Sequence, residues 1–484
     1  MYISVFMGPI SLGPAQDKPN IDLCLSQAAA AAEAGFAMVT FGEQHFNNYE
    51  PYSNPFLMAA RLAPELGGTW FGTTIVPLVF HHPLRLAEDA SVIDLLTEGR
   101  FIMGMSAGRV GFSPDFANFG LDPERRHEIF ASKLAILRRA FVHTADQPPL
   151  VMDTPWDRGA LNGRMMPYSY RAGGPLIAVG TNTDTTISEY AAQGVPVFLG
   201  PCLPQDAARK FAAYRDATAA AGHDAETLLG RSLVTRHVIV GATEEKAWER
   251  AELMAGRNPM MDRSSDTRSL RELSEVDLSD PAAVRDPANR NAVHVQSWII
   301  AGTPDTVVRQ INEYEKAGVP QLLTRFTVGA YNPAEIGASF RLFVDEVMPQ
   351  INATRFPELR DDEIRPEHRP APAATMSAES VRNDVAALAG RWNAVIATPM
   401  GDQRVVLDLA VDAAQVTGTA TQNGATVAIA DGSVGADEAQ WTVTVTAPFP
   451  MTLSYRVQAA GDTLTGSVQA GTFPPSRLTG ERAG

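Results

Sequence analysis

Glu43, Gln44 and His45 stand together directly after an apolar run, Ala37–Phe41, that has the pattern of a buried strand. Because the pKa of an imidazole lies near neutrality, His45 can relay a proton or hold a reactive oxygen species by a hydrogen bond. A histidine bonded only to backbone is the structural alternative, and the polar neighbours Glu43 and Gln44 favour the chemical role. We therefore predict His45 and Gln44 as catalytic residues.

A second polar cluster follows the apolar run Leu176–Gly180 and opens a segment of helical period. Its residues Thr181, Asn182 and Thr185 offer hydroxyl and amide groups beside the N–H groups of a helix N-terminus. Such a helix end binds phosphate, because its N–H groups are unpaired and the helix dipole is positive there. Simple N-capping needs no ligand and is compatible with phosphate binding. We predict an anion site at these three residues.

The segment Gly104–Gly108 matches GxSxG, the nucleophile elbow of serine hydrolases, with Ser106 in the nucleophile position. That elbow needs a helix that starts immediately after the serine. Gly111 and Pro114 interrupt the residues that follow, and a helical pattern begins only near Pro123. A serine hydrolase is therefore the weakest alternative that we keep.

No metal site is predicted. The two cysteines, Cys24 and Cys202, are too far apart in the chain for a CxxC motif and too few for a disulfide framework. His81 and His82 are adjacent, so their side chains point apart and do not form a helical pair of metal ligands. We assign these two histidines no catalytic role.

Eight apolar runs alternate with segments of helical period over about the first 350 residues. The predicted strands are Tyr2–Met7, Ala37–Phe41, Trp70–Ile75, Phe101–Ser106, Leu176–Gly180, Val195–Leu199, Leu233–Val240 and Gln321–Phe326. This alternation favours a TIM (β/α)8 barrel, whose functional residues come from the strand C-termini. Arg325 then either faces a ligand or forms a buried ion pair. A doubly wound open sheet is the main alternative, but no GxGxxG follows the first strand.

We divide the chain into a barrel domain, 1–355, a Pro-rich linker with a possible short helix, 356–389, and a C-terminal domain, 390–484. The last alternates with period two between turn signals, which predicts a small all-β antiparallel barrel or sandwich. It has no histidine and no cysteine, so we expect an accessory or oligomerisation module, and with it a homo-oligomer. The polar segment 257–295 is predicted to be a lid-like insertion in the barrel, with plain disorder as the alternative.

The composition excludes several classes of function. A formal net charge of −15 argues against nucleic acid, because a phosphate backbone needs a clustered basic surface. No apolar run is long enough to span a membrane, and the N-terminus lacks the basic residues of a secretory signal. Two cysteines fit a reducing compartment. We expect a cytoplasmic protein.

Several blocks of this sequence, taken together, resemble the bacterial luciferase-like family of flavin-dependent oxidoreductases over about the first 350 residues. The blocks are Gly42–Phe46, Gly72–Pro77, His82–Asp89, Gly99–Phe101, Ile177–Thr185, Ala301–Pro304 and Gln321–Phe326. In this family the first block commonly reads Glu-His-His-Phe. Here Gln44 replaces the first histidine and His45 keeps the second, so light emission does not follow from the resemblance.

The resemblance implies a set of cofactor contacts. It places a cis peptide between Thr74 and Ile75 under the isoalloxazine ring, and it puts Ser106 beside that ring. Arg109 takes the role of the family's phosphate-binding arginine if its position is shifted by two residues relative to the family pattern. The predicted cofactor-binding residues are Glu43, Thr74, Ile75, Ser106, Arg109, Thr181, Asn182 and Thr185.

The resemblance also implies the reaction. It is the monooxygenation of a small organic substrate with O2 through a flavin hydroperoxide, with reduced FMN supplied by a separate NAD(P)H:flavin reductase. Trp156, Met165, Met166, Tyr168 and Tyr170 suggest an apolar or aromatic substrate. A deazaflavin-dependent oxidoreductase that transfers hydride and a non-enzymatic flavin-binding protein are the alternatives.

Overall fold

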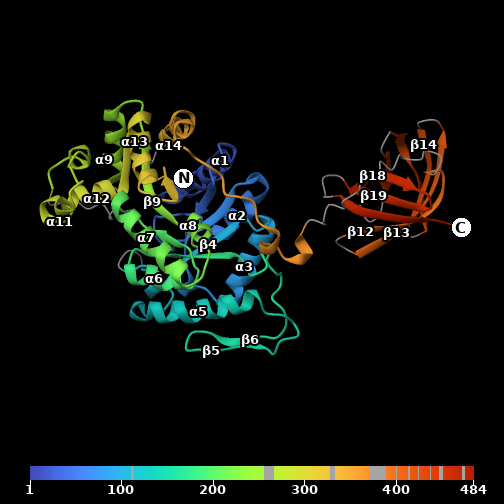
Figure 1. Ribbon diagram of the computed structural model, residues 1–484, viewed down its shortest axis with the longest axis horizontal. Coiled ribbons are helices and arrows are strands. Elements are labelled where there is room, and N and C mark those ends of the chain that lie inside the picture. The colour runs from blue at the N-terminus through green and yellow to red at the C-terminus, as the bar shows by residue number, and fades with distance from the viewer. Residues whose placement is uncertain are drawn as a thin grey trace. The chain divides into compact units, whose positions relative to one another are not determined.

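The chain forms two compact units, Met1–Arg369 and Pro370–Gly484 (Figure 1). The computed structural model describes residues 1–110, 114–255, 266–327, 333–369, 388–398, 401–412, 415–422, 424–435, 438–445, 451–470 and 475–483. Within these ranges, no helix has the length and apolar character needed to cross a membrane.

The first unit contains a closed barrel of eight parallel strands. In barrel order they are β1 (Tyr2–Phe6), β2 (Met38–Phe41), β3 (Trp70–Pro77), β4 (Phe101–Ser106), β7 (Leu176–Gly180), β8 (Val197–Leu199), β9 (Leu233–Val240) and β11 (Gln321–Arg325). The ring closes because β8 pairs with β9 and β11 pairs with β1. All eight strands expected from the apolar runs are present. The TIM-barrel prediction is confirmed, and the open-sheet alternative is wrong.

Helices cover the outside of the barrel (Figure 1). They are α1 (Pro14–Glu33), α2 (Pro55–Leu62), α3 (Pro83–Leu96), α4 (Asp115–Asn118), α5 (Arg126–Phe141), α6 (Asp184–Ala192), α7 (Pro204–Ala220), α8 (Ala225–Gly230), α9 (Glu244–Ala255), α13 (Pro304–Lys316) and α14 (Pro333–Leu342). Six of them, α1, α2, α3, α7, α13 and α14, begin with proline, which suits the first turn because it has no N–H to leave unpaired. The strands are buried on both faces, which explains their continuous apolar sequence.

Two excursions interrupt the alternation of strand and helix. The antiparallel hairpin of β5 (Leu150–Asp153) and β6 (Arg158–Leu161) follows α5, and β10 (Ile299–Gly302) pairs with the second half of β9.

The predicted lid lies partly outside the described residues, which omit 256–265. From residue 266 onward it forms α10 (Leu270–Ser274), α11 (Pro281–Arg285) and α12 (Arg290–Trp298). Leu270, Leu273, Ala292 and Val295 are buried there in a small core. Each pair is spaced three residues apart, the interval that puts two side chains on one helix face, so few apolar residues suffice to hold the segment.

Residues 356–369, the start of the predicted linker, pack against the barrel. The ring of Phe356 contacts Trp70, with ring centroids 5.3 Å apart, and Glu363 forms an ion pair with Arg171 at 2.5 Å. The next part of the predicted linker, 370–387, lies outside the described residues.

The second unit is an antiparallel barrel, so the sandwich alternative is wrong. Its strands are β12 (Gly390–Thr398), β13 (Gly401–Asp412), β14 (Gln415–Gln422), β15 (Ala425–Ala428), β16 (Ala430–Val434), β17 (Ala439–Val445), β18 (Met451–Ala460), β19 (Thr463–Ala470) and β20 (Ser476–Arg482). Eight of them close the ring through the pairing of β13 with β14, and β15 adds to the edge of β14. Trp392, Trp441 and Tyr455 fill its interior.

Candidate functional site

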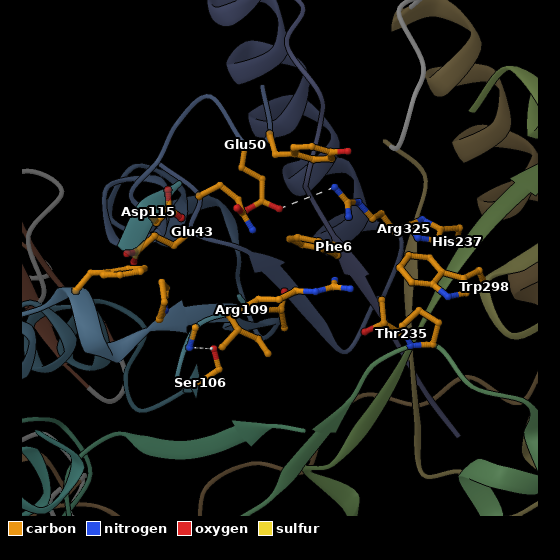
Figure 2. A pocket seen from close by; sticks show the side chains of 18 residues that line it. Phe6, Glu43, Glu50, Ser106, Arg109, Asp115, Thr235, His237, Trp298 and Arg325 are labelled. Carbon is orange, nitrogen blue, oxygen red and sulfur yellow. Dashed lines mark hydrogen bonds and ion pairs between the residues drawn. The ribbon is translucent and has the colours of Figure 1, made fainter. Parts of the chain in front are cut away.

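A cavity of about 290 Å³ lies at the C-terminal ends of the barrel strands (Figure 2). Its lining comes from β1, β3, β4, β9 and β11 and from the segments that follow β2, β4 and β8, with one residue from α12. The residues are Phe6, Glu43, Gln44, Tyr49, Glu50, Thr74, Ile75, Pro77, Phe80, Ser106, Gly108, Arg109, Asp115, Pro201, Thr235, His237, Trp298 and Arg325. This is the end of a TIM barrel at which active sites form.

Glu43 joins two histidines at the edge of this cavity. His45 Nε2 lies 2.8 Å from Glu43 Oε1, and His81 Nε2 lies 2.7 Å from the same oxygen. A carboxylate only accepts hydrogen bonds, so each imidazole donates its Nε2–H, and Nδ1 is the acceptor in each neutral ring. The sequence analysis assigned His81 no chemical role. The structure places His81 beside Glu43, because η2 (Leu78–Phe80) carries it back to the end of β2.

The electrostatics favour an ionised Glu43 beside proton-bearing imidazoles. Burial raises the pKa of Glu43, but the hydrogen bonds from His45 and His81 outweigh it and the net pKa is lowered. Burial lowers the pKa of His45, but its hydrogen bond to Glu43 and the negative charges of Glu43 and Asp115 raise the net pKa. The Glu43–His45 pair therefore holds a proton close to the cavity.

His45 itself does not line the cavity. Its ring packs edge-on against Phe119 and Phe80, with centroids 5.0 and 6.1 Å apart. It reaches the cavity through Glu43, whereas its neighbour Gln44 lines the cavity directly.

The predicted flavin-ring residues meet at one side of the cavity. The Thr74–Ile75 peptide is cis, as the resemblance implies, and Thr74 Oγ1 lies 2.7 Å from Thr40 Oγ1. Ser106 ends β4, and its Oγ accepts a hydrogen bond from the Gly108 backbone N–H at 3.2 Å. Glu43, Thr74, Ile75 and Ser106 all line the cavity.

Ser106 is not in a nucleophile elbow. The residues directly after it are not helical, and Gly108 has a positive φ of 78°. The first described helix after β4 begins at Asp115. Among the described residues, no helix N-terminus faces the serine oxygen as the hydrolase reaction requires.

The predicted phosphate contacts are split between two places. Arg109 lines the cavity and extends into it (Figure 2). Thr181, Asn182 and Thr185 lie at the N-terminal end of α6, and none lines the cavity. Asn182 Oδ1 accepts the N–H of Gly200 at 2.9 Å, next to the cavity residue Pro201. This hydrogen bond fixes the α6 end beside the cavity wall.

Glu50 and Arg325 point toward each other at one side of the cavity (Figure 2). Arg325 Nη2 lies 3.9 Å from Glu50 Oε1, and its Nε donates to the Gly8 carbonyl at 3.2 Å. The guanidinium also covers the ring of Phe6, 4.6 Å from its centroid. Both alternatives for Arg325 are therefore realised, because it lines the cavity and forms an ion pair.

Glu50 makes stability depend on pH. Burial raises its pKa to about 7, against the attraction of Arg325. From the ordinary value of 4.5 up to about 7, the native protein holds a proton that the unfolded chain has released. The free energy of unfolding contributed by Glu50 is therefore fully present at lower pH and falls by about 3 kcal/mol as pH rises through this window.

We expect Glu50→Gln to abolish this part of the pH dependence. Urea unfolding at about pH 5 and about pH 8 should show the variant losing roughly 3 kcal/mol less than the unmodified protein. The exposed Glu33→Gln is the matched control. Equal losses in both variants would contradict the assignment.

Sequence reasoning missed the wall formed by Thr235, His237 and Trp298. The rings of His237 and Trp298 stack with centroids 5.2 Å apart and planes 9° from parallel. The signal was present, since Thr235-Arg236-His237 interrupts an otherwise apolar strand and residues two apart share a face. In contrast, none of the aromatic and methionine residues between Trp156 and Tyr170 lines the cavity. Met165 is buried elsewhere, and Arg125 covers the Trp156 ring.

The fold and the site define a TIM-barrel enzyme with a cavity at the strand C-termini. The luciferase-like monooxygenase family matches residues 1–321, and the chain belongs to this family of flavin-dependent oxidoreductases.

Two curated relatives illustrate the match. The alkanal monooxygenase alpha chain of the Kryptophanaron alfredi symbiont is 26% identical over 217 residues, which cover 44% of this chain and 57% of that protein. The oxygenase component of the flavin-dependent trigonelline monooxygenase of Acinetobacter baylyi is 32% identical over 102 residues, which cover 21% and 27%. The matched part of this chain thus spans about half the length of such relatives, or less.

Solved structures share the fold. A monooxygenase from Streptomyces bottropensis has a TM-score of 0.59 at 22% identity and covers 72% of this chain and 99% of its own. The oxygenating constituent of 3,6-diketocamphane monooxygenase from Pseudomonas putida, in complex with FMN, has a TM-score of 0.56 at 19% identity and covers 74% and 100%.

Proposed function

We propose that the chain is an FMN-dependent monooxygenase that oxidises a small apolar or aromatic molecule with O2. The observation that carries the proposal is the cavity itself, where the Glu43–His45–His81 cluster meets Arg109 and the strand ends of a luciferase-like barrel. A separate NAD(P)H:flavin reductase supplies the reduced FMN. The relative named as an oxygenase component supports this division of labour.

The residues present fit a flavin. Ile75 and Phe80 offer an apolar lining for a flat ring. The buried Glu43 Oε2 and Asp115 Oδ1 have no hydrogen-bond partner in the part of the chain that the structure describes, and they suit a ring with N–H groups. Arg109 supplies the positive charge that a phosphate needs in an acidic protein. Thr181, Asn182 and Thr185 add hydroxyl and amide donors at the start of α6.

When bound, reduced FMN supplies the electrons that activate O2. The protein's own task is to exclude water and to place a proton. The aromatic side chains of Phe80 and Phe119 shield His45, and the Glu43 carboxylate fixes its Nε2–H. His45 holds the proton that Glu43 passes towards the cavity, and His81 donates a second hydrogen bond to that carboxylate. Gln44 hydrogen-bonds the reacting oxygen.

We expect Arg109→Ala to weaken FMN binding at least tenfold, because it removes a charge-assisted phosphate contact worth about 1.5 to 3 kcal/mol. Titration with oxidised FMN, followed by flavin fluorescence, measures the change. Arg85→Ala is the matched control, since Arg85 lies on the exposed face of α3 and does not line the cavity. Unchanged FMN affinity in Arg109→Ala would discard this arginine as an anchor.

A deazaflavin-dependent hydride transfer is the second candidate. A proton store beside the cavity serves either reaction, because hydride transfer to a carbonyl must be accompanied by a proton. The relatives named as monooxygenases favour the first candidate. Oxygen consumption with reduced FMN distinguishes the two, since hydride transfer to a deazaflavin consumes no O2. A non-enzymatic flavin-binding protein would take up FMN without consuming substrate.

The domain of residues 390–484 has the role of an accessory or oligomerisation module in this proposal. We expect a chain ending at Arg369 to fold and to bind FMN with an affinity within about threefold of the full chain, because the cavity is lined only by residues of the first compact unit. Gel filtration of both chains reports the loss of self-association. Loss of FMN binding would show that the second unit completes the site.

A further inference from the structure

His237 is a buried polar side chain whose ring nitrogens make no hydrogen bond to the described residues. It is 2% exposed and lines the cavity. Its Nδ1 has no hydrogen-bond partner among the described residues, and its Nε2 makes no hydrogen bond to them either. Because a buried donor or acceptor without a partner costs free energy, such a group at a cavity wall indicates a ligand.

The wall that carries His237 is held rigidly. The neighbouring Arg236 is buried, and its guanidinium donates to the Cys202 carbonyl after β8 and to the carbonyls of Gln296 and Ile299 at the end of α12. These bonds fix the end of that helix and hold Trp298 stacked on the His237 ring. The imidazole is therefore oriented before any ligand arrives.

Arg325 provides a second donor on the same side of the cavity (Figure 2). Its Nε and Nη2 are used by the Gly8 carbonyl. Nη1 makes no hydrogen bond within the described ranges. A side chain at residue 8 would meet Arg325 Nη2 at 2.6 Å, so Gly8 is needed for this placement. Guanidinium and imidazole thus offer N–H groups to one ligand oxygen.

The charges around the cavity select an uncharged oxygen. Its lining contains the acids Glu43, Glu50 and Asp115 and the cations Arg109 and Arg325. With Arg109 engaged by the cofactor phosphate, Arg325 faces the carboxylates of Glu43 and Asp115, and also that of Glu50 once the pH rises above about 7. Burial and the nearby arginines lower the pKa of His237 well below its usual value, so the ring is neutral. A ligand carboxylate would meet net repulsion, whereas a carbonyl or hydroxyl would not.

We propose that His237 and Arg325 form a substrate subsite that hydrogen-bonds one uncharged oxygen, a phenol hydroxyl or an aryl carbonyl, on a flat aromatic molecule. The ring of that molecule lies beside Phe6 and Trp298, which both line the cavity. This inference rests on the proposed function and names the substrate class that the same cavity accepts.

The test measures binding of four small probes by ligand-observed NMR, with and without FMN: phenol, acetophenone, benzoate and toluene. In the unmodified protein, phenol or acetophenone binds at least tenfold more tightly than toluene and benzoate. In His237→Phe, which keeps the ring stacked on Trp298, that preference is lost. In the control His294→Phe, at a residue that also contacts Trp298 but lies outside the cavity, it is retained.

The outcomes separate the two levels of inference. A preference that survives in His237→Phe overturns the subsite. So does a loss of FMN affinity in His237→Phe with no change in the probes, because the oxygen recognised would then belong to the flavin. Absence of FMN binding to the unmodified protein overturns the proposed function instead, and the probe preference measured without FMN still reports on the subsite.

Discussion

We expect His45→Ala to lower the ratio of oxidised substrate to O2 consumed by about a hundredfold, with hydrogen peroxide formed in place of product. The magnitude is the lower end of what a positioned proton donor contributes, because His45 acts through Glu43. The substitution also removes a ring that packs against Phe80 and Phe119, which admits water beside the cavity. FMN affinity should stay within about threefold, since His45 lines no part of the cavity. Oxygen uptake, peroxide yield and product yield are measured together with an added flavin reductase.

Two neighbouring histidines provide graded controls for this experiment. His82 is exposed and lines no part of the cavity, so His82→Ala should behave as the unmodified protein does. His81→Ala removes one of the two donors to Glu43 and should have an effect of about tenfold. A coupling ratio that is unchanged in His45→Ala would make His45 structural. Equal effects in all three variants would reject the Glu43 cluster as the proton store.

Lys133→Met is expected to lower the free energy of unfolding of the barrel by about 3 to 5 kcal/mol. Lys133 lies on α5, and its Nζ is 2.7 Å from Asp157 Oδ1 in a pair whose side chains are 7% and 2% exposed. The substitution keeps the length of the side chain but leaves the Asp157 carboxylate buried without a counter-charge. It also removes the donor that binds the His81 carbonyl at 2.9 Å. Urea unfolding is followed by the helical circular dichroism signal. This signal reports on the first unit, because the helices whose residue ranges are given above lie in it.

Two controls for Lys133→Met test the loss of an exposed ion pair and the replacement of both partners of the buried pair. Lys18→Met breaks an exposed pair with Asp22 and should cost less than about 1 kcal/mol. The double change Lys133→Met with Asp157→Leu replaces the buried pair by apolar groups and should recover most of the loss. A loss in Lys133→Met as small as that in Lys18→Met would show that the pair is hydrated in solution. A double variant as unstable as Lys133→Met would show that packing, not charge, is lost.

Local sequence determined the barrel and one side of its site. A barrel strand is buried on its outer face by helices and on its inner face by the side chains of other strands, so it is apolar throughout. Each of the eight strands can therefore be recognised in the sequence as a short apolar run. The C-termini of parallel strands meet at one end of a barrel. The polar residues that follow the runs, Glu43, Thr74 and Ser106 among them, therefore had to converge there.

Only the tertiary structure decided which of these residues touch. Glu43 and His81 belong to different strand–helix units, and so do Glu50 and Arg325. His237 owes its place to α12, which packs its Trp298 ring on a strand from another part of the chain. Such contacts depend on the register of neighbouring strands and on the path of the loops between them. An apolar run indicates that a strand is buried, but it does not predict which side chain of another strand will lie opposite its end.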